Sequence, residues 1–204
     1  MNLGNGTGIA ADSGGCKVSR CFAVNNQNDG IHASNLPDGP CVEDSQITGN
    51  SGSGAVLQGG GIYRISNTLI ANNRGQGIRS LGPLSVNNCV ITNNIQYAIS
   101  ASAYDDVSLM VSDCLIEGNG SEWQIDSLYG VSMTNTIIRN SRGGYPGMAL
   151  RTQNGTSFMK GCAFYNNAGG ALSLGGVHAT IANCVIRDNG SVGPGLSDSG
   201  GIFL

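Results

Sequence analysis

The feature that most constrains this chain is a short frame that repeats along its whole length. The frame reads apolar, any residue, Asn-like, Cys/Thr/Ser, any residue, apolar, any two residues, Asn. Eight copies place the Cys/Thr/Ser position at Cys21, Ser45, Thr68, Cys89, Cys114, Thr136, Cys162 and Cys184. Successive copies are 21 to 26 residues apart, and a period of this length is typical of chains that fold by stacking similar units.

A second element precedes each frame and consists of a small or polar residue followed by an aliphatic one. Its aliphatic members are Ile9, Ile31, Ala55, Ile78, Ile99, Ile125, Leu150 and Leu172. Each repeat therefore holds three short alternating runs, which are separated by turn residues and are too short for helices. Three strands per repeat predict an all-β, single-stranded parallel β-helix, and parallel crossovers are right-handed by default. Leucine-rich repeats have a similar length, but their leucine frame is missing here.

We expect one domain over residues 1–204 with about eight three-strand rungs. The rungs are predicted at roughly 8–29, 30–53, 54–76, 77–97, 98–123, 124–148, 149–170 and 171–200. The chain begins almost directly in a rung and stops in what looks like the first strand of another. Since solenoids need capped ends, we expect a fragment that lacks end caps, completed by the rest of a longer chain or by a capping partner.

The repeat also assigns roles to asparagine and cysteine. The Asn-like positions are expected at a sharp left-handed bend between strands, where their stacked side chains form a structural spine; these are Asp44, Asn67, Asn88, Asp113, Asn135 and Asn183. The sixth copy departs from the frame because its Asn comes one place early, at Asn140. Five of the seven cysteines share one inward column, which predicts small buried thiols, and no cysteine spacing fits a metal site.

Composition excludes several classes of function. Charged residues make up 11% of the chain, the formal net charge is −3, and no run of Lys or Arg forms a basic patch, so nucleic acid is not an expected partner. No apolar run is long enough for a membrane span. No signal peptide opens the chain, which has neither a basic start nor an apolar stretch.

Segments such as GGGIYRISNTLIANN, LSVNNCVITNN and ATIANCVIRDN resemble the right-handed parallel β-helix repeat of the pectin-lyase-like superfamily. The repeats look most like those of secreted or surface-anchored microbial proteins. The resemblance implies an extracellular or cell-surface location, with any signal peptide lying upstream of this chain. It implies no single activity, because relatives include polysaccharide lyases, glycosidases, epimerases, tailspikes and adhesins.

In enzymes of this superfamily the groove over the first strand commonly carries the site. One residue past each aliphatic, an outward column is predicted through Ala10, His32, Val56, Arg79, Ser100, Asp126, Arg151 and Ser173. The candidate catalytic residues are Asp126, Arg151 and Arg79. The candidate substrate-binding residues, on the strands or in the longer turns beside them, are Trp123, Tyr145, Tyr104, Gln153 and Glu122. His32 is expected to stand alone on its face.

Two functions from different classes remain. The first is a rigid rod of about 40 Å, eight rungs at about 4.8 Å, that serves as a scaffold, an adhesion element or a glycan-binding module without a cofactor. The second is a lyase or hydrolase of acidic polysaccharide. A lyase would use Arg79 or Arg151 as base, with Asp126 as a partial calcium ligand; a hydrolase would need two spaced carboxylates.

Overall fold

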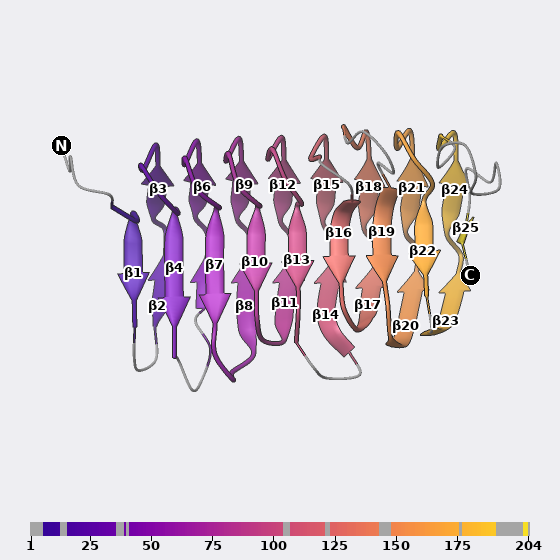
Figure 1. Ribbon diagram of the computed structural model, residues 1–204, viewed down its shortest axis with the longest axis horizontal. Coiled ribbons are helices and arrows are strands. Elements are labelled where there is room, and N and C mark those ends of the chain that lie inside the picture. Colours follow the sequence, from indigo (N-terminus) through magenta and orange to yellow (C-terminus); the bar gives the residue numbers. More distant parts are fainter. Residues whose placement is uncertain are drawn as a thin grey trace.

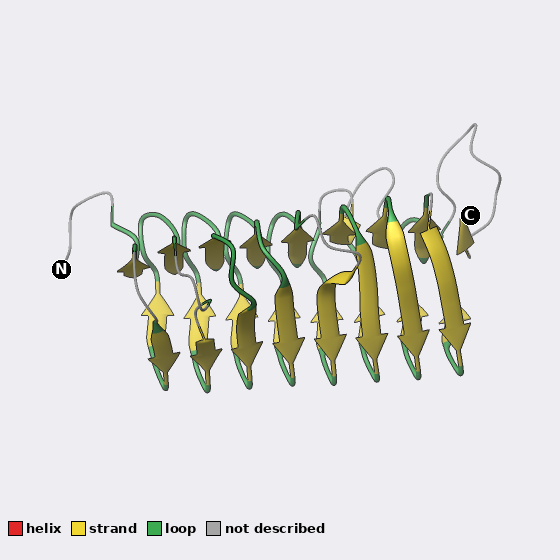
Figure 2. Cartoon of the chain, turned by 90° about the horizontal axis from the view of Figure 1, so that it is seen from below, coloured by secondary structure: helices red, strands yellow, loops and turns green. Residues whose placement is uncertain are grey.

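The computed structural model describes residues 6–12, 16–35, 39, 41–103, 107–120, 123–142, 148–175, 177–190 and 202–203. In these residues the chain forms short strands and turns, and none of them is helical (Figure 2). The strands wind into a solenoid with three parallel sheets around one apolar core (Figure 1). The predicted all-β parallel β-helix is confirmed. The described part of the chain offers no helix with the length and hydropathy needed to span a membrane.

Each coil contributes one strand to each sheet. The first sheet contains β1 (Ile9–Ala11), β4 (Ile31–Ser34), β7 (Ala55–Gln58), β10 (Ile78–Ser80), β13 (Ile99–Ala101), β16 (Trp123–Ser127), β19 (Met148–Thr152), β22 (Leu172–Leu174) and β25 (Ile202–Phe203). The second contains β2 (Lys17–Ser19), β5 (Cys41–Glu43), β8 (Tyr63–Ser66), β11 (Leu84–Asn87), β14 (Val107–Ser112), β17 (Gly130–Thr134), β20 (Gly155–Lys160) and β23 (Val177–Ala182). The third contains β3 (Phe22–Val24), β6 (Gln46–Thr48), β9 (Leu69–Ala71), β12 (Val90–Thr92), β15 (Leu115–Glu117), β18 (Ile137–Arg139), β21 (Ala163–Tyr165) and β24 (Val185–Arg187).

The register follows the predicted aliphatic columns. In the first sheet Ile78 pairs with Ala55 on one side and Ile99 on the other, and all three are fully buried. In the third sheet Ile91 lies between Ile70 and Ile116, which are also fully buried. Because side chains alternate between the two faces of a strand, the residue that follows each of these aliphatics points outward.

Two residues separate the second and third strands in all eight coils. The first of them has a left-handed backbone, and the Asn and Asp predicted at this bend all adopt it, with φ from 47° to 55°. Asn88 Nδ2 donates to Asn67 Oδ1 at 2.8 Å, and Asn67 Nδ2 donates to Asp44 Oδ1 at 3.1 Å. The predicted stacking is therefore present, but these side chains are exposed to solvent.

The buried asparagine ladder lies in another column, at the last Asn of each frame. Asn73 Nδ2 donates to Asn94 Oδ1 at 2.9 Å, and Asn94 Nδ2 donates to Asn119 Oδ1 at 2.8 Å. Each amide also caps a backbone carbonyl, as Asn94 does with Ile70 at 3.3 Å. The predicted stack at the bend is therefore one of two asparagine ladders, and the second, which follows the third strand, is the one protected from water.

The sixth coil has no Asn in this ladder, and a glutamine fills the gap. Asn140 occupies the left-handed position before the ladder, at φ 54°, so Ser141 stands where the amide belongs. Gln124, fully buried, accepts from Asn119 Nδ2 at 3.2 Å and donates to Asn167 Oδ1 at 3.0 Å. The ladder thus continues across the sixth coil through a side chain from β16.

The cysteine column forms a third stack. Cys89, Cys114 and Cys162 are buried, and the backbone N–H of Cys89 donates to Cys114 Sγ at 3.4 Å. All seven cysteines are free. The predicted burial holds for three of the five cysteines in this column, whereas Cys21 and Cys184, in the first and last coils, are partly exposed. Cys41, predicted outward, is partly exposed, and Val42, its neighbour in β5, is buried.

Candidate functional site

The outward face of the first sheet brings Asp126 and Arg151 into direct contact. They are register partners on β16 and β19. Arg151 Nε donates to Asp126 Oδ1 and Nη2 to Oδ2, each at 2.8 Å, so the pair is bidentate. Both side chains are mostly shielded from solvent, at 27% and 16% exposure for Arg151 and Asp126. Two parallel charge-assisted hydrogen bonds hold the guanidinium in one orientation.

An aromatic pair extends this contact. The Arg151 guanidinium carbon lies 3.6 Å from the ring centroid of Trp123, within cation–π range. Tyr97 stacks with Trp123 at a centroid separation of 6.2 Å and an interplanar angle of 30°. Trp123 Nε1 is buried without a hydrogen-bond partner among the described residues. The expectation that Trp123 belongs to a flanking turn was wrong, since it opens β16 and packs along the sheet.

Two other predicted residues lie on the same face without touching this cluster. Arg79 pairs in register with Ser100, which pairs with Asp126, so Arg79 is two strands away, about 10 Å along the axis. Gln153 follows β19 and lies two residues beyond Arg151. The remaining predicted binding residues, Tyr104, Glu122 and Tyr145, are outside the described residues.

His32 has a partner in the structure, Asp29, that was not predicted from the sequence. Its Nδ1 lies 3.3 Å from Asp29 Oδ2, and Asp29 Oδ1 accepts the backbone N–H of Ser53 at 2.8 Å. The signal was available, because a carboxylate three residues before a strand-borne histidine lies on the turn that leads into that strand. His32 lies on β4, which is four strands along the first sheet from β16, the strand that carries Trp123 and Asp126.

The described residues on this face do not fit a calcium ion. Calcium takes six to eight oxygen ligands, with carboxylates foremost. Both carboxylate oxygens of Asp126 already accept from Arg151. Within the described ranges, no group of three His, Cys, Asp or Glu side chains comes close enough to hold a metal.

A second polar cluster, unforeseen from the sequence, lies on the third sheet. Glu117, Arg139 and Tyr165 are consecutive register partners at the ends of β15, β18 and β21. Arg139 donates to Glu117 Oε2 at 2.8 Å and to the Tyr165 hydroxyl at 2.9 Å. The Arg139 guanidinium lowers the pKa of the Glu117 carboxyl, and Glu117 in turn raises the pKa of Arg139. Their common position, one residue past the inward Ile/Phe column, is the sequence signal from which this alignment could have been predicted.

The coil, the sheets and the asparagine ladder define a right-handed parallel β-helix. A family model described as a right handed beta helix region matches residues 38–145, just over half of the chain, and the chain belongs to this family. The predicted right-handed, pectin-lyase-like fold is thereby confirmed.

Among solved structures, this chain is similar to the crystal structure of pectate lyase Pel9A. The TM-score is 0.51 and the sequence identity is 13%. The match covers 83% of this chain and 58% of that one, so this chain spans little more than half of the enzyme's length. At this identity the likeness shows the fold alone. A comparison with curated proteins gives no match.

Proposed function

We propose that this chain is a rigid β-helix module that binds acidic polysaccharide without cleaving it. The observation that carries the proposal is the mutual engagement of Asp126 and Arg151. They are two of the three candidate catalytic residues on the first sheet, and Arg79 is the third. Each has its principal hydrogen-bonding groups occupied by the other, so neither is placed to exchange a proton with a substrate.

The rest of the outward column supports binding over cleavage. Hydrolysis with inversion needs two carboxylates about 6.5–9.5 Å apart, and Asp126 is the one carboxylate in the column from Ala10 to Ser173. Elimination needs a base, for which Arg79 is the remaining candidate. No described carboxylate is aligned with Arg79 to position a substrate acid through calcium.

The same face carries groups suited to an anionic chain. Arg79 is exposed on β10, and Arg151 keeps Nη1 without a hydrogen-bond partner among the described residues. Arg79 and the remaining Nη1 of Arg151 lie about 15 Å apart, three strand spacings along a rigid sheet, and each can donate to one carboxylate of an extended polymer. The resemblance to secreted and surface-anchored repeats supports an extracellular or cell-surface location for such a module.

The test is a binding and cleavage assay on the same samples. The full chain is titrated with polygalacturonate and with an uncharged polysaccharide, with and without calcium, while unsaturated-uronate absorbance and new reducing ends are followed. We expect saturable binding of the acidic polymer and no cleavage. The double variant Arg79→Gln/Arg151→Gln should weaken binding by at least about tenfold. Arg64→Gln is the matched control, since Arg64 is exposed on the second sheet.

Cleavage that disappears in Asp126→Ala or Arg79→Ala would overturn the proposal. It would establish the alternative, a polysaccharide lyase or glycoside hydrolase, and the absorbance would separate the two reactions. The likeness to a pectate lyase fold is the observation that keeps this alternative worth testing. Equal binding by the double variant and the Arg64→Gln control would also overturn the assignment to the first sheet.

A further inference from the structure

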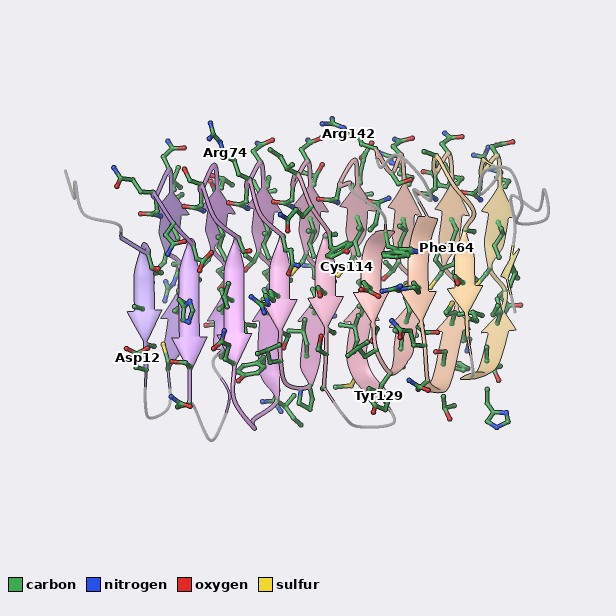
Figure 3. The ribbon with its side chains drawn as sticks, viewed as in Figure 1. Asp12, Arg74, Cys114, Tyr129, Arg142 and Phe164 are labelled. Atoms are coloured by element: carbon green, nitrogen blue, oxygen red, sulfur yellow. The ribbon has the colours of Figure 1, made fainter. Side chains whose placement is uncertain are left out.

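A polar depression lies at the outer edge of the third sheet, away from the face discussed above. It forms where β12, β15 and β18 end, and it encloses about 410 Å³, which is within the size range of small-molecule sites. Its lining residues are Thr92, Asn93, Glu117, Gly118, Asn140 and Arg142. Figure 3 shows Arg142 at the edge where the turns after the third strands emerge.

The depression exists because one turn residue has no side chain. The residue after each third strand adopts a left-handed backbone, and Asn93, Gly118 and Asn140 occupy this position in three successive coils. At Gly118, with φ 63°, an added Cβ would lie 2.9 Å from Asn93 Oδ1. The glycine therefore interrupts a column of asparagine side chains, and its backbone forms a floor between Asn93 and Asn140 that the side chains of Asn93 and Arg142 approach closely.

The charges around this floor do not cancel. Glu117 is fully engaged, with Oε2 on Arg139 and Oε1 accepting from Asn140 Nδ2, both at 2.8 Å. Arg142 is a second cation, and its Nε lies 3.4 Å from the site of the absent Gly118 Cβ. It has no ion-pair partner within the described residues. Among the described residues, the depression thus presents one positive charge in excess, that of Arg142.

Hydrogen-bonding groups without partners surround that charge. Neither the Asn93 amide nor the Thr92 hydroxyl has a hydrogen-bond partner in the described part of the chain. Asn140 uses its Nδ2 for Glu117, and its Oδ1 remains to accept a bond. Since buried or half-buried polar groups bind most strongly to matching polar groups, the ligand that fits here carries several hydroxyls and one negative charge.

We propose that this depression, the turn site, binds one sugar acid. The carboxylate would pair with Arg142, and ring hydroxyls would bond to the Asn93 amide, the Thr92 hydroxyl and Asn140 Oδ1. The turn site lies on the third sheet and is independent of the polymer face proposed on the first sheet. Free sugar acids and the terminal residues of acidic glycans share this chemistry.

Two variants test the site without disturbing the fold. Gly118→Asn fills the floor with the residue that the neighbouring coils carry at the same φ. Arg142→Gln removes the unmatched charge. Gly49→Asn is the matched control, because Gly49 holds the same turn position near the N-terminal end, at φ 68°. Thermal unfolding of all three variants verifies that they fold.

The measurement is a titration of the full chain with galacturonate, glucuronate and glucose, followed by amide chemical shifts in ¹H–¹⁵N spectra. A second arm uses short acidic oligosaccharides to separate free sugar acids from chain ends. We expect shifts at Asn93, Gly118 and Asn140 with a sugar acid and none with glucose. Affinity should fall at least about tenfold in Gly118→Asn and Arg142→Gln, and stay unchanged in Gly49→Asn.

Several results would overturn the turn site. They are an absence of shifts with any sugar acid, equal shifts with glucose, or undiminished binding by folded Gly118→Asn. Its failure is distinguishable from that of the polymer face, because Arg79→Gln/Arg151→Gln should leave the sugar-acid shifts intact. Conversely, Gly118→Asn should leave binding of long polygalacturonate to the first sheet intact.

Discussion

At the scale of single residues, Cys162 shows how a buried column controls protonation. Its thiol is 1% exposed, and Sγ donates to the Lys160 carbonyl at 3.5 Å. Burial raises the pKa of the Cys162 thiol from its ordinary value of 9.0 to about 11. The folded chain therefore keeps this thiol neutral at a pH where the unfolded chain has already ionised it.

This difference predicts a loss of stability in alkali. A raised pKa in the folded state contributes stability that is complete below pH 9 and disappears as the pH approaches about 11. We expect Cys162→Ser, which places in this column the residue type found at Ser45, to remove about 2–3 kcal/mol of that pH dependence. Urea unfolding of the unchanged chain and of Cys162→Ser at pH 8, 9, 10 and 11 measures how the free energy of unfolding depends on pH. Parallel curves for the two proteins would contradict the prediction.

Several residue positions could be predicted because the frame fixes them. The adjacency of Asp126 and Arg151 follows from counting one place past Ile125 and Leu150, whose burial the pattern demands. Trp123 could not be placed this way, since the turn between the third and first strands varies in length and the frame does not show that β16 begins at Trp123. The Arg151 stacking on Trp123 depends on that early start.

At the scale of the element, the sixth coil shows how a repeat tolerates a missing member. Gln124 comes from the first sheet and has one more methylene than asparagine. It reaches the ladder position and makes the bonds to Asn119 and Asn167 that an Asn at position 141 would make. Nothing in the frame predicts this replacement, because Gln124 belongs to a different strand from the residue that it replaces.

Removing this amide should be costly. Gln124→Ala removes the bonds to the Asn119 amide, the Asn167 side-chain oxygen and the Arg139 carbonyl and leaves a cavity in the core. The backbone N–H of Asn119 also loses its acceptor, Gln124 Oε1. We expect a loss of about 3 kcal/mol or more in the free energy of unfolding. Adding Ser141→Asn to that variant should restore part of it, because the ladder amide returns. Chemical denaturation of the unchanged chain, Gln124→Ala and Gln124→Ala/Ser141→Asn measures the three free energies of unfolding.

The exposed ladder supplies the control for that experiment. Asn88→Gly removes a stacked amide at the bend and keeps the left-handed backbone available. Since water replaces the bond to Asn67, the loss should stay below about 1 kcal/mol. A larger loss for Asn88→Gly than for Gln124→Ala would reverse the structural roles assigned to the two ladders.

At the scale of the whole molecule, stability depends on contacts between neighbouring coils. Each strand pairs only with its equivalents before and after it, so the fold is close to a one-dimensional stack. Ile99 on β13 lies near the middle of this stack and is fully buried. A charge there would disrupt both the coil before it and the coil after it.

We therefore expect Ile99→Asp to abolish cooperative folding, because a carboxylate would be buried among aliphatic side chains. Asp126→Ala, on the outward face of a nearby strand, should fold. Circular dichroism during thermal unfolding compares the two. A soluble Ile99→Asp protein with a cooperative transition would show that the inward register assigned here is wrong.

The corner between the second and third strands has two residues in every coil, whereas other parts of the repeat vary in length. Each coil passes this corner in the same number of residues, so the variation between 21 and 26 residues per repeat falls at the other two corners and in the lengths of the first and second strands. The strand register is kept through these changes except at one bulge, between Val107 and Leu109 of β14. Over evolutionary time one edge of the rod can thus stay fixed while the other two acquire new loops, and an engineer could graft recognition segments at those edges without redesigning the core.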